Sequence, residues 1–100
     1  MTQAEALAQK VRRLALNRQG TEAQVFLPEG FLYLRADGFA RFAQGPGAEA
    51  LSGFALARGE LVLCFSDGSA LTLRHRLGRL ERRVTSRRAC PPPRAGGFCR

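Results

Sequence analysis

The stretch ELVLCFSDGSALTLRHR, residues 60–76, carries the clearest fold signal in the sequence. Two apolar segments flank Asp67-Gly68, a pair favoured at the centre of a two-residue type I′ turn because both positions need a positive φ. The stretch therefore predicts a β-hairpin. This turn would bring four apolar side chains onto one face of the hairpin, and we expect that face to point into the core: Val62, Cys64, Leu71 and Leu73.

Residues 2–18 predict an N-terminal helix. Thr2 is followed three residues later by Glu5, which is the pattern of a capping box. Apolar side chains then recur at helical spacing at Leu7, Val11 and Leu14. Gly20 would end the helix. We expect the apolar stripe of this helix to pack on the apolar face of the hairpin.

Short alternating segments between the helix and the hairpin predict further strands, at residues 23–27, 31–35, 39–43 and 54–56. Pro28 in the sequence LPEG favours a turn between the first two. Asp37-Gly38 repeats the hairpin signal of positions 67 and 68, thirty residues earlier. Two such signals with similar alternation before each are also the pattern expected of a duplicated hairpin unit.

These elements predict an α+β fold, in which the N-terminal helix packs on an antiparallel sheet of about four to six strands built from hairpins. Leu77, Leu80 and Val84 indicate a short basic C-terminal helix. The segment from Cys90 onward has three consecutive prolines and predicts a flexible tail. One hundred residues correspond to one domain. We therefore expect a single folded domain over 1–88 and a Pro/Gly-rich tail over 89–100.

The net charge of +8 is concentrated at one end of the chain. Residues 1–73 balance seven basic and seven acidic side chains, whereas residues 74–100 hold nine Arg and one Glu. Such a segment can neutralise nucleic-acid phosphates, an acidic protein surface or an anionic lipid layer. It can also be a solvated face in a proteome biased towards Arg. The predicted nucleic-acid-binding residues are Arg74, Arg76, Arg79, Arg82, Arg83, Arg87 and Arg88. Aromatic side chains are not interleaved with them, so base-specific recognition is not predicted.

The hairpin over residues 31–43 offers a different hypothesis, because both of its faces are largely apolar. Such a hairpin is either covered on both sides or used as a contact surface, in a homodimer or with another protein. The predicted interface residues are Phe31, Tyr33, Phe39 and Phe42. The chain would then be a protein–protein adaptor or a small chaperone-like subunit.

Catalytic and cofactor-binding patterns are missing from the sequence. The single histidine, His75, would stand opposite Glu60 in the predicted hairpin, as a general base or, more simply, as a surface charge pair. Cys90, Cys99 and His75 are too scattered for a metal site, and no phosphate-binding loop is present. We therefore expect a non-enzymatic module without cofactor or metal. No segment predicts a signal peptide or a membrane span, so we expect a cytoplasmic location.

Overall fold

The structure, a computed structural model, describes residues 1–43 and 51–85. Within these residues one helix, α1 (Gln3–Lys10), precedes two four-stranded antiparallel sheets. The first sheet contains β1 (Arg13–Leu16), β2 (Glu22–Leu27), β3 (Gly30–Arg35) and β4 (Ala40–Ala43). The second contains β5 (Leu51–Ala57), β6 (Glu60–Phe65), β7 (Ala70–Arg76) and β8 (Arg79–Thr85). In each sheet every strand pairs with its neighbour in the sequence.

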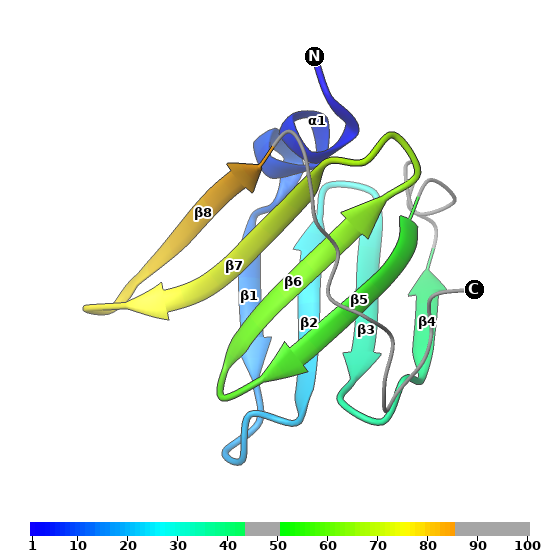
Figure 1. Ribbon diagram of the computed structural model, residues 1–100. Helices are drawn as coiled ribbons and strands as arrows, with labels where there is room; N and C mark the ends of the chain where they lie inside the picture. Colours follow the sequence, from blue (N-terminus) through cyan, green and yellow to red (C-terminus); the bar gives the residue numbers. More distant parts are fainter. Residues whose placement is uncertain (44–50, 86–100) are drawn as a thin grey trace.

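The two sheets pack face to face around one core, and the strands of the second sheet cross those of the first diagonally (Figure 1). The helix covers one end of this core, where it lies against β6, β7 and β8. The α+β class and the antiparallel hairpins are confirmed, but the strands form two sheets rather than one. Each sheet has one apolar face to cover, and stacking the sheets covers both faces at once.

The N-terminal helix is shorter than predicted. Its capping box is confirmed, since Thr2 Oγ1 accepts a hydrogen bond from the Glu5 N–H at 3.1 Å and Glu5 Oε1 accepts one from the Thr2 N–H at 2.9 Å. The helix ends at Lys10, however, and Leu14 lies in strand β1. Leu7, Val11 and Leu14 are all buried, as expected, although they reach the core from two elements.

The central hairpin has a register one residue away from the predicted one. Leu63 pairs with Leu71, and Cys64 with Ala70. The loop has three residues, because the Phe65 N–H donates to the Ser69 carbonyl oxygen at 3.0 Å and Gly68 has a φ of 89°. Such a loop is a type I turn followed by a glycine bulge. The core face is therefore formed by Leu61, Leu63, Phe65, Leu71 and Leu73, and Val62 lies on the opposite face.

The predicted C-terminal helix is wrong, because residues 79–85 form strand β8. Leu77 and Gly78 both have positive φ, 54° and 77°, and make a two-residue type I′ turn between β7 and β8. Leu80 and Val84 pack against the core, on the same face of β8 as Arg82 between them. The alternation in this segment is therefore that of a strand. The predicted tail, with Cys90 and Cys99, lies outside the described residues.

The strand pairing within the first sheet recurs within the second sheet, thirty residues later in the sequence. The Cα pairs Leu32–Phe42 and Leu34–Ala40 of the first sheet correspond to Val62–Thr72 and Cys64–Ala70 of the second. The pairs of β2 with β3 recur in β5 with β6 in the same way, apart from an irregularity between Leu51 and Gly53. The two units nevertheless turn opposite faces to the core: Leu32 and Leu34 are buried in the first, whereas Leu61, Leu63 and Phe65 are buried in the second.

The turn of the central hairpin also holds the start of the helix. Asp67 Oδ2 accepts a hydrogen bond from the Gln3 N–H at 2.9 Å, and the hydroxyl of the buried Ser69 accepts one from the Ala4 N–H at 3.1 Å. These two groups satisfy helix N–H donors that have no partner within the helix. The hydrogen bonds, above all the one from Gln3, lower the pKa of Asp67 below its usual value.

We expect Asp67→Asn to destabilise the protein at neutral pH and to have little effect in acid. Because the pKa of Asp67 is lowered in the folded state, its stabilising contribution is present above the ordinary Asp pKa and is lost as the pH falls through the lowered value. Thermal unfolding of the unaltered chain and of Asp67→Asn, followed from pH 7 downward, measures this pH-dependent contribution. The two melting temperatures should converge in acid, and a constant gap would contradict the assignment.

Candidate nucleic-acid interface

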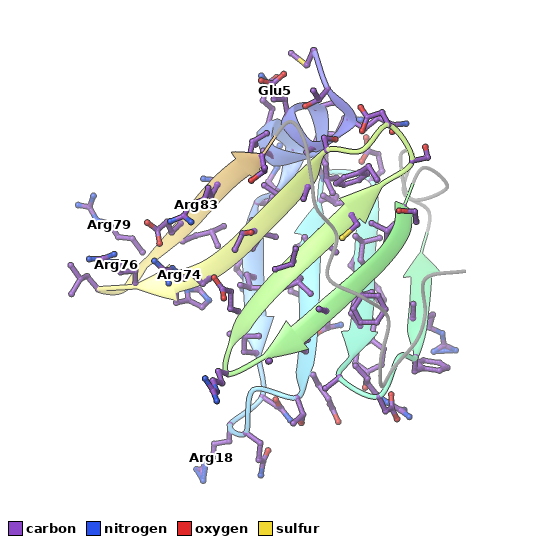
Figure 2. All side chains as sticks on the ribbon, viewed as in Figure 1. Glu5, Arg18, Arg74, Arg76, Arg79 and Arg83 are labelled. Carbon is purple, nitrogen blue, oxygen red and sulfur yellow. The ribbon has the colours of Figure 1, made fainter. Side chains whose placement is uncertain are left out.

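Four arginines lie on one face of the β7–β8 hairpin. The register pairs Arg76 with Arg79, Arg74 with Glu81 and Thr72 with Arg83, and directly opposed residues of an antiparallel pair share a face. Figure 2 shows the four side chains along this hairpin, with Arg76 and Arg79 nearest its turn. We call this the arginine surface: Arg74, Arg76, Arg79 and Arg83. Since Arg79 and Arg83 are four residues apart, they lie about 13 Å apart along the strand.

The outer part of this hairpin projects from the body of the protein. The pairing of β6 with β7 ends at Leu61 and Leu73, so β7 continues beyond it with β8 as its neighbour. Figure 1 shows the turn between β7 and β8 extending past the edge of the first sheet. Arg74, Arg76 and Arg79 are therefore carried on a two-stranded arm, residues 74–81, whereas Arg83 lies on the same face where β7 also pairs with β6.

The acidic side chains on this face are held by one of the four arginines. Arg74 Nε donates to Glu81 Oε1 at 2.6 Å, and Arg74 Nη1 lies 4.0 Å from Glu60 Oε2. The hydrogen bond from Arg74 and the charges of Arg76 and Arg83 lower the pKa of Glu81. Among the described residues Arg76, Arg79 and Arg83 make no ion pair. These three guanidinium groups are thus available to an external anion.

Not every predicted arginine belongs to this surface. Arg82 lies on the opposite face of β8, where its Nη2 donates to the Val11 carbonyl oxygen at 2.8 Å. Val11 is the C-cap of α1, a position where a positive charge is favourable. Arg82 therefore joins the hairpin to the helix. Arg87 and Arg88 lie outside the described residues.

His75 and Glu60 are not paired as the sequence predicted, because the one-residue shift places Arg74 next to Glu60 instead. The His75 ring donates from Nε2 to the Leu14 carbonyl oxygen, at 2.7 Å. His75 thereby ties the arm to β1 of the first sheet. Within residues 1–43 and 51–85 no three His, Cys, Asp or Glu side chains are close enough to hold a metal ion.

A second surface feature lies on the outer face of the first sheet. The Phe26 and Phe31 rings are 6.3 Å apart and the Tyr33 and Phe39 rings 6.0 Å apart, and Phe39 is 45% exposed. We call this the aromatic surface: Phe26, Phe31, Tyr33 and Phe39. Of the predicted interface residues it brings together Phe31, Tyr33 and Phe39. For Phe42 the structure describes the backbone pairing with Leu32 alone.

Arginines also contact the aromatic surface, which the linear sequence does not reveal. Arg13 lies over the Phe26 ring and Arg35 over the Phe39 ring, each 4.7 Å from the ring centroid. Phe26 and Arg13 were missed because they come from β1 and β2, outside the hairpin on which the prediction was based. The alternation of Gln24 and Phe26 with the buried Ala23, Val25 and Leu27 was the available signal.

No helix in the described part of the chain has the length and apolar character needed to cross a membrane. No family model matches the chain, and the comparisons with curated proteins and with solved structures found no match either.

Proposed function

We propose that this protein is a non-enzymatic module that binds nucleic-acid phosphates, without base specificity, through its arginine surface. The observation that carries the proposal is the alignment of three arginines without ion pairs, Arg76, Arg79 and Arg83, on one face of the β7–β8 hairpin, whose end projects as a two-stranded arm. A row of guanidinium groups suits a polyanion, because each can replace condensed counterions along the phosphate backbone.

The arrangement of charges on this face favours binding of a polyanion over binding of a single small anion. Arg74 is occupied by Glu81 and Glu60, so it contributes little free charge. The three remaining arginines are spread along both strands instead of converging on one point. Residues 70–85 of this hairpin contain no Phe, Tyr or Trp, in contrast to the first sheet with its paired rings and ring-over-arginine contacts. Binding through phosphates therefore fits this surface better than stacking on bases.

Replacing all three arginines by Gln is expected to abolish most of the binding. The variant Arg76→Gln/Arg79→Gln/Arg83→Gln should lose roughly a hundredfold in affinity at low salt, and the log–log slope of affinity against salt should fall by about 2.7, or about 0.9 for each lost phosphate contact. Fluorescence anisotropy of a labelled mixed-sequence oligonucleotide, titrated with the full chain from low to physiological salt, measures both quantities.

A matched variant separates local contacts from total charge. Arg12, Arg18 and Arg41 are exposed and make no side-chain ion pair among the described residues, and Figure 2 shows Arg18 far from the arm. Their triple replacement by Gln removes the same charge and should leave the slope nearly unchanged. Equal losses in both variants would show that binding follows net charge and would overturn the assignment of the site. No binding by the unaltered chain at low salt would overturn the function itself.

The aromatic surface favours a second candidate function, a contact with another protein or a second copy of the chain. Its support is the clustering of four aromatic side chains on the outward face of the first sheet. An apolar contact of this kind would be nearly independent of salt and would appear in sedimentation velocity as a larger species. The two candidate functions are thus distinguished by their response to salt.

A further inference from the structure

The turn at the end of the arm combines two unusual features in one residue. Leu77 occupies the first central position of the type I′ turn with a φ of 54°, a conformation that Asn, Asp and Gly adopt far more readily than a branched apolar residue. Leu77 is also 91% exposed. Neither the backbone of this turn nor the core of the protein accounts for a leucine here, and strained residues of this kind often serve a function.

The other two-residue type I′ turn shows what the fold itself requires. Arg58 and Gly59, between β5 and β6, have nearly the same backbone angles, φ 54° and 78°. That turn carries a polar side chain, and its glycine lies against Gly20 in the loop after β1. At the end of the arm an added Cβ on Gly78 would meet nothing within 4 Å. The apolar side chain of Leu77 therefore points into open space at the end of the arm, without a role in the packing of the described residues.

The residues beside Leu77 indicate the chemistry of that partner. Arg76 and Arg79 form the last pair of the hairpin, so the exposed leucine lies in the turn directly next to two arginines without ion pairs. An apolar tip with two cations at its base fits a ligand with an apolar interior between two rows of negative charge. A nucleic-acid duplex has this construction, with stacked bases between two phosphate backbones.

We propose that the arm binds double-stranded nucleic acid from the minor groove and that Leu77 inserts between two stacked base pairs, with Arg76 and Arg79 on the flanking phosphates. This inference rests on the proposed function and names its ligand. Insertion of an apolar side chain unstacks one base step and bends the duplex. Because the minor groove distinguishes base pairs poorly, such binding agrees with a lack of base specificity.

A lipid bilayer is the other layered anionic ligand, and the observations favour it less. Stable attachment to a membrane needs a large apolar area or two independent anchors. Among the described residues Leu77 and Met1 are the large hydrophobic side chains exposed beyond one half, and Met1 lies at the N-terminal end beside α1 (Figure 1). One leucine suffices to wedge open a base step but provides little area for a bilayer.

The test is Leu77→Asn, a change that the turn should accept better than leucine because Asn is favoured at this position. The variant is expected to fold normally, to bind a duplex of about 20–30 base pairs roughly tenfold more weakly, and to keep the salt slope of the unaltered chain. A duplex with 2-aminopurine at its centre and a dye at each end reports unstacking and bending. Both signals should be lost in Leu77→Asn and kept in Leu77→Met, which retains an apolar side chain.

The outcomes separate the wedge from the function on which it rests. If Leu77→Asn binds and bends the duplex as well as the unaltered chain, while the triple arginine variant does not bind, the wedge is wrong and phosphate binding stands. If the unaltered chain does not bind nucleic acid at all, both proposals fail. If it binds vesicles of phosphatidylserine and phosphatidylcholine in a Leu77-dependent manner but binds no duplex, the arm is a membrane contact and the proposal is overturned.

Discussion

Leu63→Ala is expected to lower the free energy of unfolding by about 3–5 kcal/mol, because it removes a fully buried side chain from the middle of the core. Leu63 lies in β6, a central strand of the second sheet, and pairs with Phe54 on one side and Leu71 on the other. The rigid backbones of both neighbouring strands limit collapse around the cavity. Since a domain of this size has about 5–15 kcal/mol of stability, the variant should be close to unfolding.

The neighbouring residue provides the control. Val62 is half-buried on the outer face of the same strand, between Ala55 and Thr72. Val62→Ala should therefore cost about 1 kcal/mol or less. Urea denaturation of the unaltered chain, Leu63→Ala and Val62→Ala measures how far each substitution lowers the free energy of unfolding, and the m-value should stay unchanged. A larger cost at Val62 than at Leu63 would mean that the hairpin has the register of a two-residue turn and that the assigned core face is wrong.

This pair of residues marks the place where sequence reasoning failed in detail. The position of the hairpin was predictable from two apolar segments around Asp67-Gly68. Its register was not, because Asp-Gly occurs both in two-residue turns and in three-residue turns with a glycine bulge. Here the Asp67 carboxylate accepts hydrogen bonds from the Ser69 N–H and hydroxyl, at 2.9 Å and 2.5 Å, which supports the longer loop. Comparing the two registers for the more apolar face would have selected the correct one.

The extent of the N-terminal helix and the segment around residues 77–85 were mispredicted because local patterns competed with tertiary packing. The stripe of Leu7, Val11 and Leu14 fits a helix, but the chain leaves the helix at Val11 and pairs Leu14 with Val25 of β2. Similarly, the spacing of Leu77, Leu80 and Val84 is compatible with a helix. In the structure, however, Leu77 and Gly78 have left-handed backbone angles and form the turn of a hairpin. In both places the partner strand decides the structure, and a single segment does not contain that information.

The candidate site was likewise predictable in part from the sequence. A run of arginines was visible in the sequence, because charge is a property of composition. The separation of Arg82 from Arg76, Arg79 and Arg83 was not visible, because it depends on which residues of β8 point outward. The exposure of Leu77, on which its proposed role rests, was hidden as well, since it becomes apparent only when the turn is placed at the end of a projecting arm.

Gly20→Ala is expected to lower the free energy of unfolding by about 2–5 kcal/mol, through two effects that add. Gly20 has a φ of 72°, and a side chain there costs about 1–2 kcal/mol through backbone strain. An added Cβ would also lie 3.0 Å from the Gly59 nitrogen, which belongs to the turn between β5 and β6. The loop after β1 and this turn belong to different sheets, so the collision would push the two sheets apart.

Neither side of this contact can easily move. Asn17 holds the loop, because its Oδ1 accepts hydrogen bonds from the Thr21 and Glu22 N–H groups at 2.7 Å and 2.9 Å. The opposing atoms belong to the backbone of a two-residue turn, which cannot rotate away as the end of a long side chain can. Overpacking against a fixed backbone typically costs a further 1–3 kcal/mol.

Gly78→Ala isolates the first effect from the second. Gly78 has a similar φ of 77°, but an added Cβ there would meet no atom within 4 Å. This variant should therefore show the strain alone, about 1–2 kcal/mol. Urea denaturation of both variants and the unaltered chain gives the free energy lost in each. The excess loss in Gly20→Ala over Gly78→Ala measures the contact between the sheets. Equal destabilisation by the two substitutions would mean that the loop after β1 does not touch the β5–β6 turn, whereas a clear excess at Gly20 would place that contact among the interactions that hold the two sheets together.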